Sequence, residues 1–124
     1  MTWKIVRLEL APTSKFPRGS AGRAFLLNVP IDECGRIDRV AIGRDPTRAT
    51  VRRFWASEPD SFGTVEALDD GWNLRCRQGG GDETTFLLDR TPLNLNSQVN
   101  VSIPEGAQLP FRVASIRSLG SATE

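Results

Sequence analysis

Apolar and polar residues alternate along most of the chain, most clearly between residues 64 and 77. A period of two is typical of a β-strand with one buried face. Asp70-Gly71 separates two such runs, and Asp-Gly between alternating runs is the strongest short-range signal for a hairpin. The sequence therefore predicts an antiparallel hairpin whose turn residues are Asp70 and Gly71.

The predicted hairpin implies a register that can be checked. Val65 lies opposite Cys76 on an apolar face, and Glu66 lies opposite Arg75 on the other face, where opposite charges attract. A slip of one residue would bury Arg75, so we expect the two faces to be well specified. Leu68 is the apolar exception on the polar face, which indicates either an exposed residue or a second buried surface.

Similar patterns predict about eight strands separated by turn signals. The expected strand segments are residues 3–10, 23–29, 36–42, 49–56, the hairpin 65–77, and then 84–89, 99–103 and 109–116. The last two should form a second hairpin, with Ile103 opposite Leu109 and Val101 opposite Phe111. Residues 11–22 and 57–61 are expected to be loops, and Phe16 should dock on the rest of the fold.

These segments favour a single all-β domain over residues 1–117, followed by a polar tail over residues 118–124. No window combines a period of 3.6 with capping residues, so we expect little or no helix. An antiparallel β-barrel, or a barrel-like sandwich, is the predicted architecture. We prefer the barrel because closure removes the exposed edge strands of so short a sheet.

One strand differs from the others because arginine and aromatic residues occupy both of its faces. In residues 49–56, Arg53 and Trp55 share a face with Val51, whereas Arg52 and Phe54 share the opposite face. We expect the polar groups of this strand to lie at a rim or an edge. Its aromatic residues are expected to cover the sheet.

Composition sets the broad class of protein. The 124 residues are enough for one domain with a real core, and the 25% of charged residues is ordinary for a soluble protein. No apolar run approaches the length of a membrane span, and the first residues lack a secretory signal, so a cytoplasmic location is expected. Cys34, in an expected turn, and Cys76, on an apolar strand face, do not make a disulfide framework.

Charge is uneven along the chain. Residues 1–53 hold 11 basic and 5 acidic residues, whereas residues 54–124 hold 5 basic and 10 acidic residues. Six arginines between residues 36 and 53 are followed by five acidic residues between 58 and 70. These segments either pair across neighbouring strands or leave a basic face for an anionic partner. The bias of 14 arginines over 2 lysines fits a genome rich in G and C, or selection for bidentate anion contacts.

Several chemical groups are missing from the chain. Without histidine or tyrosine, the commonest general base, the commonest metal ligand and any phenolic acid are absent. We therefore expect no metal and no cofactor. Catalysis would depend on the carboxylate pairs Asp69-Asp70 and Asp82-Glu83, or on Cys34, which makes a hydrolase the third of our hypotheses.

Residues 98–103 and 109–115 resemble, over this short stretch, the flavin-binding barrel of ferredoxin reductases. In that family an arginine precedes the aromatic residue of the flavin-binding segment, whereas Arg112 follows Phe111 here. This departure leaves the chain unassigned to the family, although the resemblance keeps a flavin among the ligands to consider.

Two functional hypotheses lead. The first is a non-catalytic binding or interaction module with an unknown protein partner, and the second is a barrel that binds an anionic small molecule, flavin-like or nucleotide-like. A homodimer stays open, a membrane partner is not expected, and a net charge of +1 disfavours nucleic acid. The candidate ligand-binding residues are Arg18, Arg23, Arg52, Arg53, Trp55 and Arg112.

Overall fold

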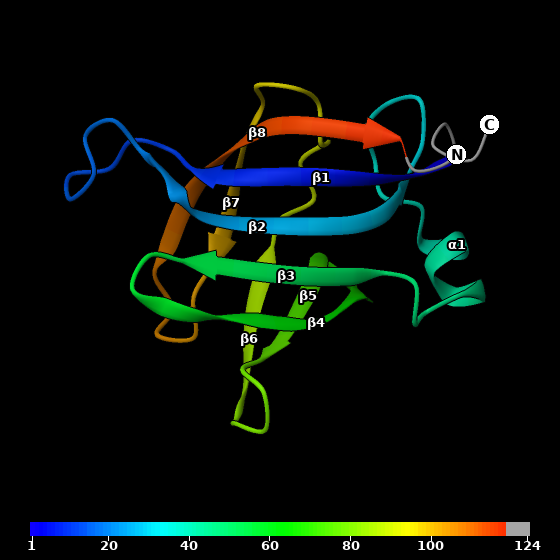
Figure 1. Cartoon of the computed structure of the whole chain (residues 1–124). Helices are drawn as coiled ribbons and strands as arrows, with labels where there is room; N and C mark the ends of the chain where they lie inside the picture. Colours follow the sequence, from blue (N-terminus) through cyan, green and yellow to red (C-terminus); the bar gives the residue numbers. More distant parts are fainter. Residues whose placement is uncertain (119–124) are drawn as a thin grey trace.

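Eight antiparallel strands close into one barrel in the computed structural model, which describes residues 1–118 (Figure 1). Each strand pairs with its neighbours in sequence, and β8 pairs with β1 to complete the closure. The strands are β1 (Thr2–Leu10), β2 (Ser20–Ile31), β3 (Thr50–Trp55), β4 (Glu58–Leu68), β5 (Gly71–Arg77), β6 (Glu83–Leu88), β7 (Gln98–Ser102) and β8 (Gln108–Ser118). The all-β prediction is confirmed, and the architecture is a barrel and not a sandwich.

The expected strand over residues 36–42 is wrong. Its second half belongs to helix α1 (Arg39–Arg44), and only Ile37 makes an isolated bridge, to Ile31. Asp38 caps the helix, because its carboxylate accepts a hydrogen bond from the Ala41 N–H at 3.1 Å. A helix of six residues is too short to show a period of 3.6, so the pattern missed it. No helix of the described residues is long and apolar enough to cross a membrane.

The expected loop over residues 57–61 is also wrong, because β4 already begins at Glu58. The chain reverses at Ala56-Ser57, where Ser57 adopts a positive φ of 71°. A β-bulge between Arg53 and Trp55 leaves Pro59 without a paired residue on β3. The missing N–H of proline therefore breaks no ladder hydrogen bond.

Both predicted hairpins form, but each is offset from its predicted register by two residues. In the first, Val65 lies opposite Leu74 and the turn is Asp69-Asp70, one residue before the predicted turn. In the second, Val101 lies opposite Leu109. The inward faces were nevertheless predicted correctly, because an offset of two residues returns every side chain to the same face.

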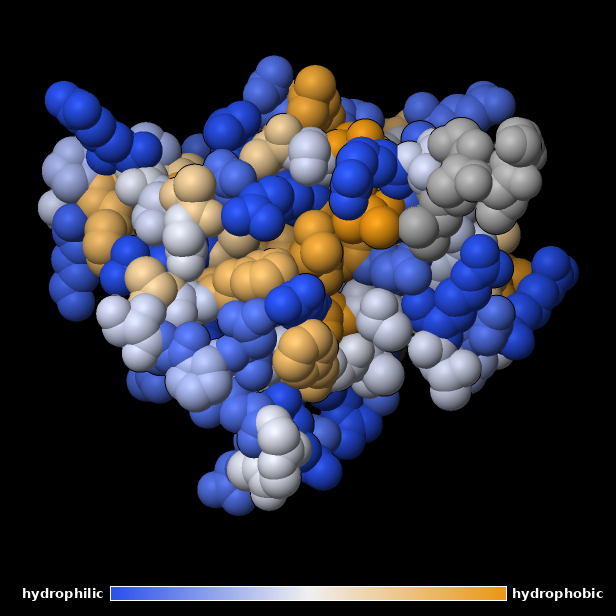
Figure 2. All heavy atoms as spheres, viewed as in Figure 1, coloured by the Kyte–Doolittle hydropathy of each residue, from blue (hydrophilic) through white to orange (hydrophobic). Residues whose placement is uncertain are grey.

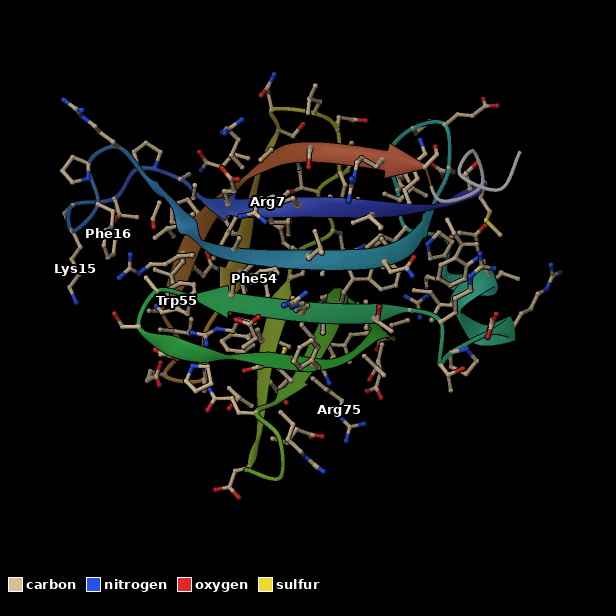
Figure 3. The ribbon with its side chains drawn as sticks, in the orientation of Figure 1. Arg7, Lys15, Phe16, Phe54, Trp55 and Arg75 are labelled. Atoms are coloured by element: carbon tan, nitrogen blue, oxygen red, sulfur yellow. The ribbon has the colours of Figure 1, made fainter. Side chains whose placement is uncertain are left out.

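The polar face of the first hairpin keeps its charge pairing despite the offset. Arg75 forms ion pairs with Glu66 at 2.8 Å and with Glu83 at 3.0 Å (labelled in Figure 3). Hydrogen bonds to Glu83 and then to Glu66 raise the pKa of Arg75. Leu68 is exposed, which agrees with the simpler of the two predictions for it.

The loop between β1 and β2 is anchored as predicted, but it covers residues 11–19 and not 11–22, because β2 already begins at Ser20. Phe16 packs against the core from the middle of the loop, and the Arg23 guanidinium lies 4.2 Å from the centre of its ring. Gly19 closes the loop with a φ of +73°, and a Cβ there would lie 2.5 Å from the Leu10 carbonyl oxygen. The predicted tail lies largely outside the described residues.

The two ends of the barrel are built differently. At the end that carries α1, which we call the closed end, aliphatic side chains and the indole rings of Trp3 and Trp72 fill the interior, and Leu93 from the β6–β7 connection is buried with them. The turn before α1 is held by Asp32, whose carboxylate accepts hydrogen bonds from the N–H groups of Arg36 and Cys34 and whose pKa is thereby lowered. At the opposite end, which we call the open end, the interior is not filled.

Candidate functional site

A cavity of about 460 Å³ occupies the interior at the open end of the barrel. An eight-stranded barrel is just wide enough for its interior to be filled by side chains or to hold one small ligand. The cavity is bounded by the β3–β4 turn, the β5–β6 connection and the β7–β8 turn. Among its lining residues are Phe25, Arg53, Trp55, Glu58, Ser61, Cys76, Asp82, Phe86, Glu105 and Phe111.

The floor of the cavity is aromatic. The ring of Phe25 meets those of Phe86 and Phe111 edge to face, and both centroid distances are 5.3 Å. Trp55 extends the cluster toward the opening, with its ring 6.4 Å from that of Phe111. Phe25 and Phe111 are almost fully buried, so the aromatic surface that an apolar ligand could contact comes mainly from Phe86 and the half-buried Trp55.

Arg53 brings a positive charge into this apolar chamber. It follows Val51 and precedes Trp55 on the inward face of β3, so the alternation of the strand directs its side chain into the barrel. Its guanidinium carbon lies 4.4 Å from the centre of the Trp55 ring and 5.2 Å from that of Phe86. The side chain is only 13% exposed.

The hydrogen bonding of Arg53 is incomplete. Its Nη1 donates to the Glu58 carboxylate at 3.1 Å, but its buried Nε has no partner in the structure. A guanidinium offers five N–H donors, and leaving a buried donor of a charged group unpaired costs free energy. The Nε has almost no accessible surface, so a ligand in the chamber would meet the other N–H groups of this planar cation, and a carboxylate matches their geometry.

Two further polar groups lie in the wall. Ser61 faces Arg53 across the β3–β4 ladder and is 5% exposed. Cys76 is buried on β5, where desolvation raises the pKa of its thiol to about 11, although the Arg53 charge partly opposes this shift. A thiol with such a pKa stays protonated near neutral pH, so it serves as a weak donor and not as a nucleophile.

The charges around the cavity are unequal. Arg53 is the one cation among the lining residues, whereas Glu58, Asp82 and Glu105 are acidic. Glu58 lies at the start of β4 and is half exposed, and Asp82 and Glu105 come from the two neighbouring connections. Acidic side chains therefore outnumber Arg53 among the lining residues, and Arg23 lies outside the lining, 5.9 Å from the centre of the Trp55 ring.

The structure places two of the six candidate residues at the cavity and the other four elsewhere. Arg53 and Trp55 line the cavity, but Arg52 and Arg112 point outward, where Arg52 pairs with Asp60 at 2.8 Å and Arg112 donates to Asn96. The Arg23 guanidinium carbon lies 4.2 Å from the centre of the Phe16 ring and 5.9 Å from that of Trp55, and Arg23 does not line the cavity. Arg18 is exposed in the β1–β2 loop. Outward orientation follows from alternation, since Arg52 is adjacent to inward-facing Arg53.

The outer surface near β3 carries its own stack of side chains. Arg52 lies over Phe54 at 4.4 Å and over Phe62 at 5.2 Å. Arg7 lies 5.6 Å from the centre of the Phe54 ring (both residues are labelled in Figure 3). Figure 2 shows hydrophobic residues gathered across the middle of this face, with hydrophilic residues around them. These contacts agree with the prediction that the aromatic residues of β3 cover the sheet in the case of Phe54, whereas Trp55 faces the cavity.

The basic segment pairs with the acidic segment where the two are adjacent in the sheet. Arg52 pairs with Asp60 and Arg53 pairs with Glu58, both across the β3–β4 ladder. Three other arginines, Arg36, Arg39 and Arg90, line a separate cleft of about 360 Å³ at the closed end. The cross-strand interpretation is thus correct for β3, and the arginines do not form one continuous face.

Sequence reasoning missed some of the lining residues and correctly anticipated others. The sequence places Glu58 in the expected loop 57–61 and does not indicate Phe86 or Ser61 as candidate ligand-binding residues. The inward orientation of Phe86 could have been predicted from alternation along β6, because Phe86 is buried and the next residue, Leu87, is exposed. Cys76 was correctly predicted to be a buried apolar-face residue. Among residues 1–118, no three Cys, Asp or Glu side chains gather as a metal site would require.

Comparison of the chain with family models, with curated proteins and with solved structures finds no significant match. The evidence for function therefore comes from the cavity itself.

Proposed function

We propose that this protein binds, without catalysis, a small molecule that carries a carboxylate or a similar planar anionic group on an apolar body. The observation that carries the proposal is Arg53, a largely buried guanidinium that lines the unfilled cavity and stacks on Trp55. The ligand carboxylate accepts hydrogen bonds from Arg53, and the apolar body packs on the aromatic floor.

The size and lining of the cavity support this class of ligand. Small-molecule sites typically have volumes of about 300–1,000 Å³, are mainly apolar and contain a few convergent polar groups. The cavity of about 460 Å³ lies in this range and combines aromatic rings with Arg53 and Ser61. A flavin or a nucleotide belongs to the same broad class of anionic ligand, but no feature of the cavity favours either one.

A purely macromolecular interaction module is the weaker hypothesis. It would explain the exposed apolar groove lined by Ile5, Leu26 and Phe62 on the outer face, but not a charged side chain directed into an unfilled interior. Catalysis is weaker still. The exposed Cys34 and the turn residues Asp69 and Asp70 do not line the cavity, and the Cys76 thiol stays protonated near neutral pH. Asp82 does line the cavity, but the other member of its pair, Glu83, does not line it and forms an ion pair with Arg75 at 3.0 Å.

The test is calorimetric titration with 3-phenylpropanoate as a probe. Hydrogen bonds to a charged group contribute about 1.5–3 kcal/mol, so Arg53→Met should weaken binding by roughly tenfold to a hundredfold. The matched control is Arg52→Met, one residue away on the outer face, which should bind the probe as the wild type does. The neutral 3-phenylpropanamide should bind weakly to all three proteins.

Equal losses in the Arg53 and Arg52 variants, or the absence of binding by the wild type, would contradict the proposal. We further propose that the protein acts in the cytoplasm, where the free thiols of Cys34 and Cys76 would stay reduced. Recovery of the chain outside the cytoplasm on cell fractionation would exclude this location.

A further inference from the structure

We infer that the preferred ligand of the open-end cavity is a zwitterion, with an ammonium group close to its carboxylate and an apolar or aromatic side chain. This inference rests on the proposed function, because it takes Arg53 as the partner of the ligand carboxylate. It adds a second recognition element, Glu58, which would accept a hydrogen bond from the ligand ammonium.

The first argument comes from the charge balance at the opening. The charged residues that line the cavity are Arg53 and three acids, Glu58, Asp82 and Glu105. A simple anion would enter past three like charges, and it would leave Glu58 facing a second carboxylate once it bound Arg53. A zwitterion adds no net charge and places its positive group where the acidic side chains are.

The second argument comes from the geometry of the Arg53–Glu58 pair. Glu58 reaches Nη1 of Arg53 at 3.1 Å and is itself 46% exposed, whereas Arg53 is 13% exposed. The carboxylate of the pair thus lies nearer the solvent and the guanidinium lies deeper, with its Nε free of partners. A ligand with its carboxylate toward Arg53 and its ammonium toward Glu58 matches the order of these charges.

The third argument comes from the position of the aromatic floor. Phe86 lies 5.2 Å from the Arg53 guanidinium and stacks edge to face on Phe25. A ring attached by a short linker to the charged head would therefore contact Phe86 while the head engages Arg53. An α-amino acid with an aromatic side chain has this shape and fits a cavity of about 460 Å³.

Three probes that share one phenyl ring separate the charges. L-phenylalanine is zwitterionic, 3-phenylpropanoate lacks the ammonium group, and 2-phenylethylamine lacks the carboxylate. For the wild type, calorimetric titration should give a dissociation constant about tenfold lower for L-phenylalanine than for 3-phenylpropanoate, and weaker binding of 2-phenylethylamine. The wild-type comparison needs no variant to fold.

Glu58→Gln should remove this preference. We expect it to raise the dissociation constant of L-phenylalanine about tenfold and to leave that of 3-phenylpropanoate no higher than in the wild type. Asp60→Asn is the matched control, because Asp60 lies two residues along β4 and pairs with outward-facing Arg52. It should keep the wild-type preference. Thermal unfolding of both variants checks that each is folded before titration.

The outcomes separate the two proposals. If 3-phenylpropanoate binds the wild type through Arg53 as tightly as L-phenylalanine does, the zwitterion inference is wrong and the proposed function stands. A preference that survives Glu58→Gln would overturn the role given to Glu58. Binding of 2-phenylethylamine as tight as that of L-phenylalanine, or no binding of either carboxylate, would overturn the inference together with the proposed function.

Discussion

The two ends of the barrel share the same strands but have different interiors. On β3, Val51 is buried in the packed half, and two residues later Arg53 enters the cavity. On β5, Leu74 is fully buried, and two residues later Cys76 lines the cavity wall. Within one inward face, residues at the closed end stabilise the fold, and residues at the open end are available for a ligand.

The comparison shows that burial alone does not distinguish a core from a site. Leu74 and Cys76 are both almost inaccessible to solvent, and both strands alternate normally. What differs is whether the neighbouring side chains fill the space between opposite walls. At the open end they do not, and the residues there include an arginine, a serine and a cysteine.

The largest effect should come from removing packed volume at the closed end. Leu74→Ala should destabilise the protein by about 3 kcal/mol, because it deletes buried methyl groups and leaves a cavity. Urea unfolding measures the loss. The control is Leu87→Ala on β6, where the side chain is 46% exposed and the expected change is within about 0.5 kcal/mol. Similar losses of unfolding free energy in both variants would show that Leu74 does not contribute more to the packed core than the exposed Leu87.

A smaller effect should appear at alkaline pH at the wall of the open end. Burial raises the pKa of Cys76 from 9.0 to about 11, so the folded state keeps the thiol protonated while the unfolded chain ionises. The contribution of Cys76 is therefore complete below pH 9 and is lost as pH rises toward 11. Between pH 9 and about pH 10.5 the loss should be about 1.5 kcal/mol.

Urea unfolding of the wild type and of Cys76→Ala over this pH range measures the contribution of Cys76 by difference. Cys34→Ala is the control, because the Cys34 thiol is exposed and its removal should leave the alkaline loss unchanged. An identical pH dependence in the wild type and in Cys76→Ala would show that water reaches the Cys76 thiol in the folded state. The wall of the open end would then not be closed around this residue.

The smallest effect on stability should come from Arg53 itself. Arg53→Met removes a buried charge with an unpartnered Nε and replaces it with a flexible apolar side chain. We expect the free energy of unfolding to stay within about 1 kcal/mol of the wild type, or to rise. A loss of about 3–5 kcal/mol in urea unfolding would instead identify the Arg53–Glu58 pair as a structural element.

Much of the fold was predictable because the information is local. The alternation in β4, β5, β7 and β8 indicated which side chains face inward, and those faces are correct. The same alternation placed Val51, Arg53 and Trp55 on one face, which was enough to nominate two of the cavity residues. Helix α1 was not predictable from periodicity, since six residues give less than two turns.

The registers were wrong for a specific physical reason. An offset of two residues, as in both hairpins, leaves each side chain on its predicted face, so no hydrophobic pattern opposes it. The bulge beside Arg53 likewise has no clear signal in the sequence, although it brings Glu58 opposite Trp55 at the opening. The Arg53–Glu58 pair was therefore not predictable, even though each residue was visible in the chain.

The sequence by itself determined most of the strands, their inward faces and the absence of histidine chemistry, because each depends on composition or on neighbouring residues. Only the tertiary structure decided where along the barrel the inward side chains fill the space and where they leave a cavity. That outcome depends on closure and register, which bring together side chains from strands far apart in the chain. Arg53 is inward-facing by sequence, and it lines a candidate ligand site because the surrounding strands leave space beside it.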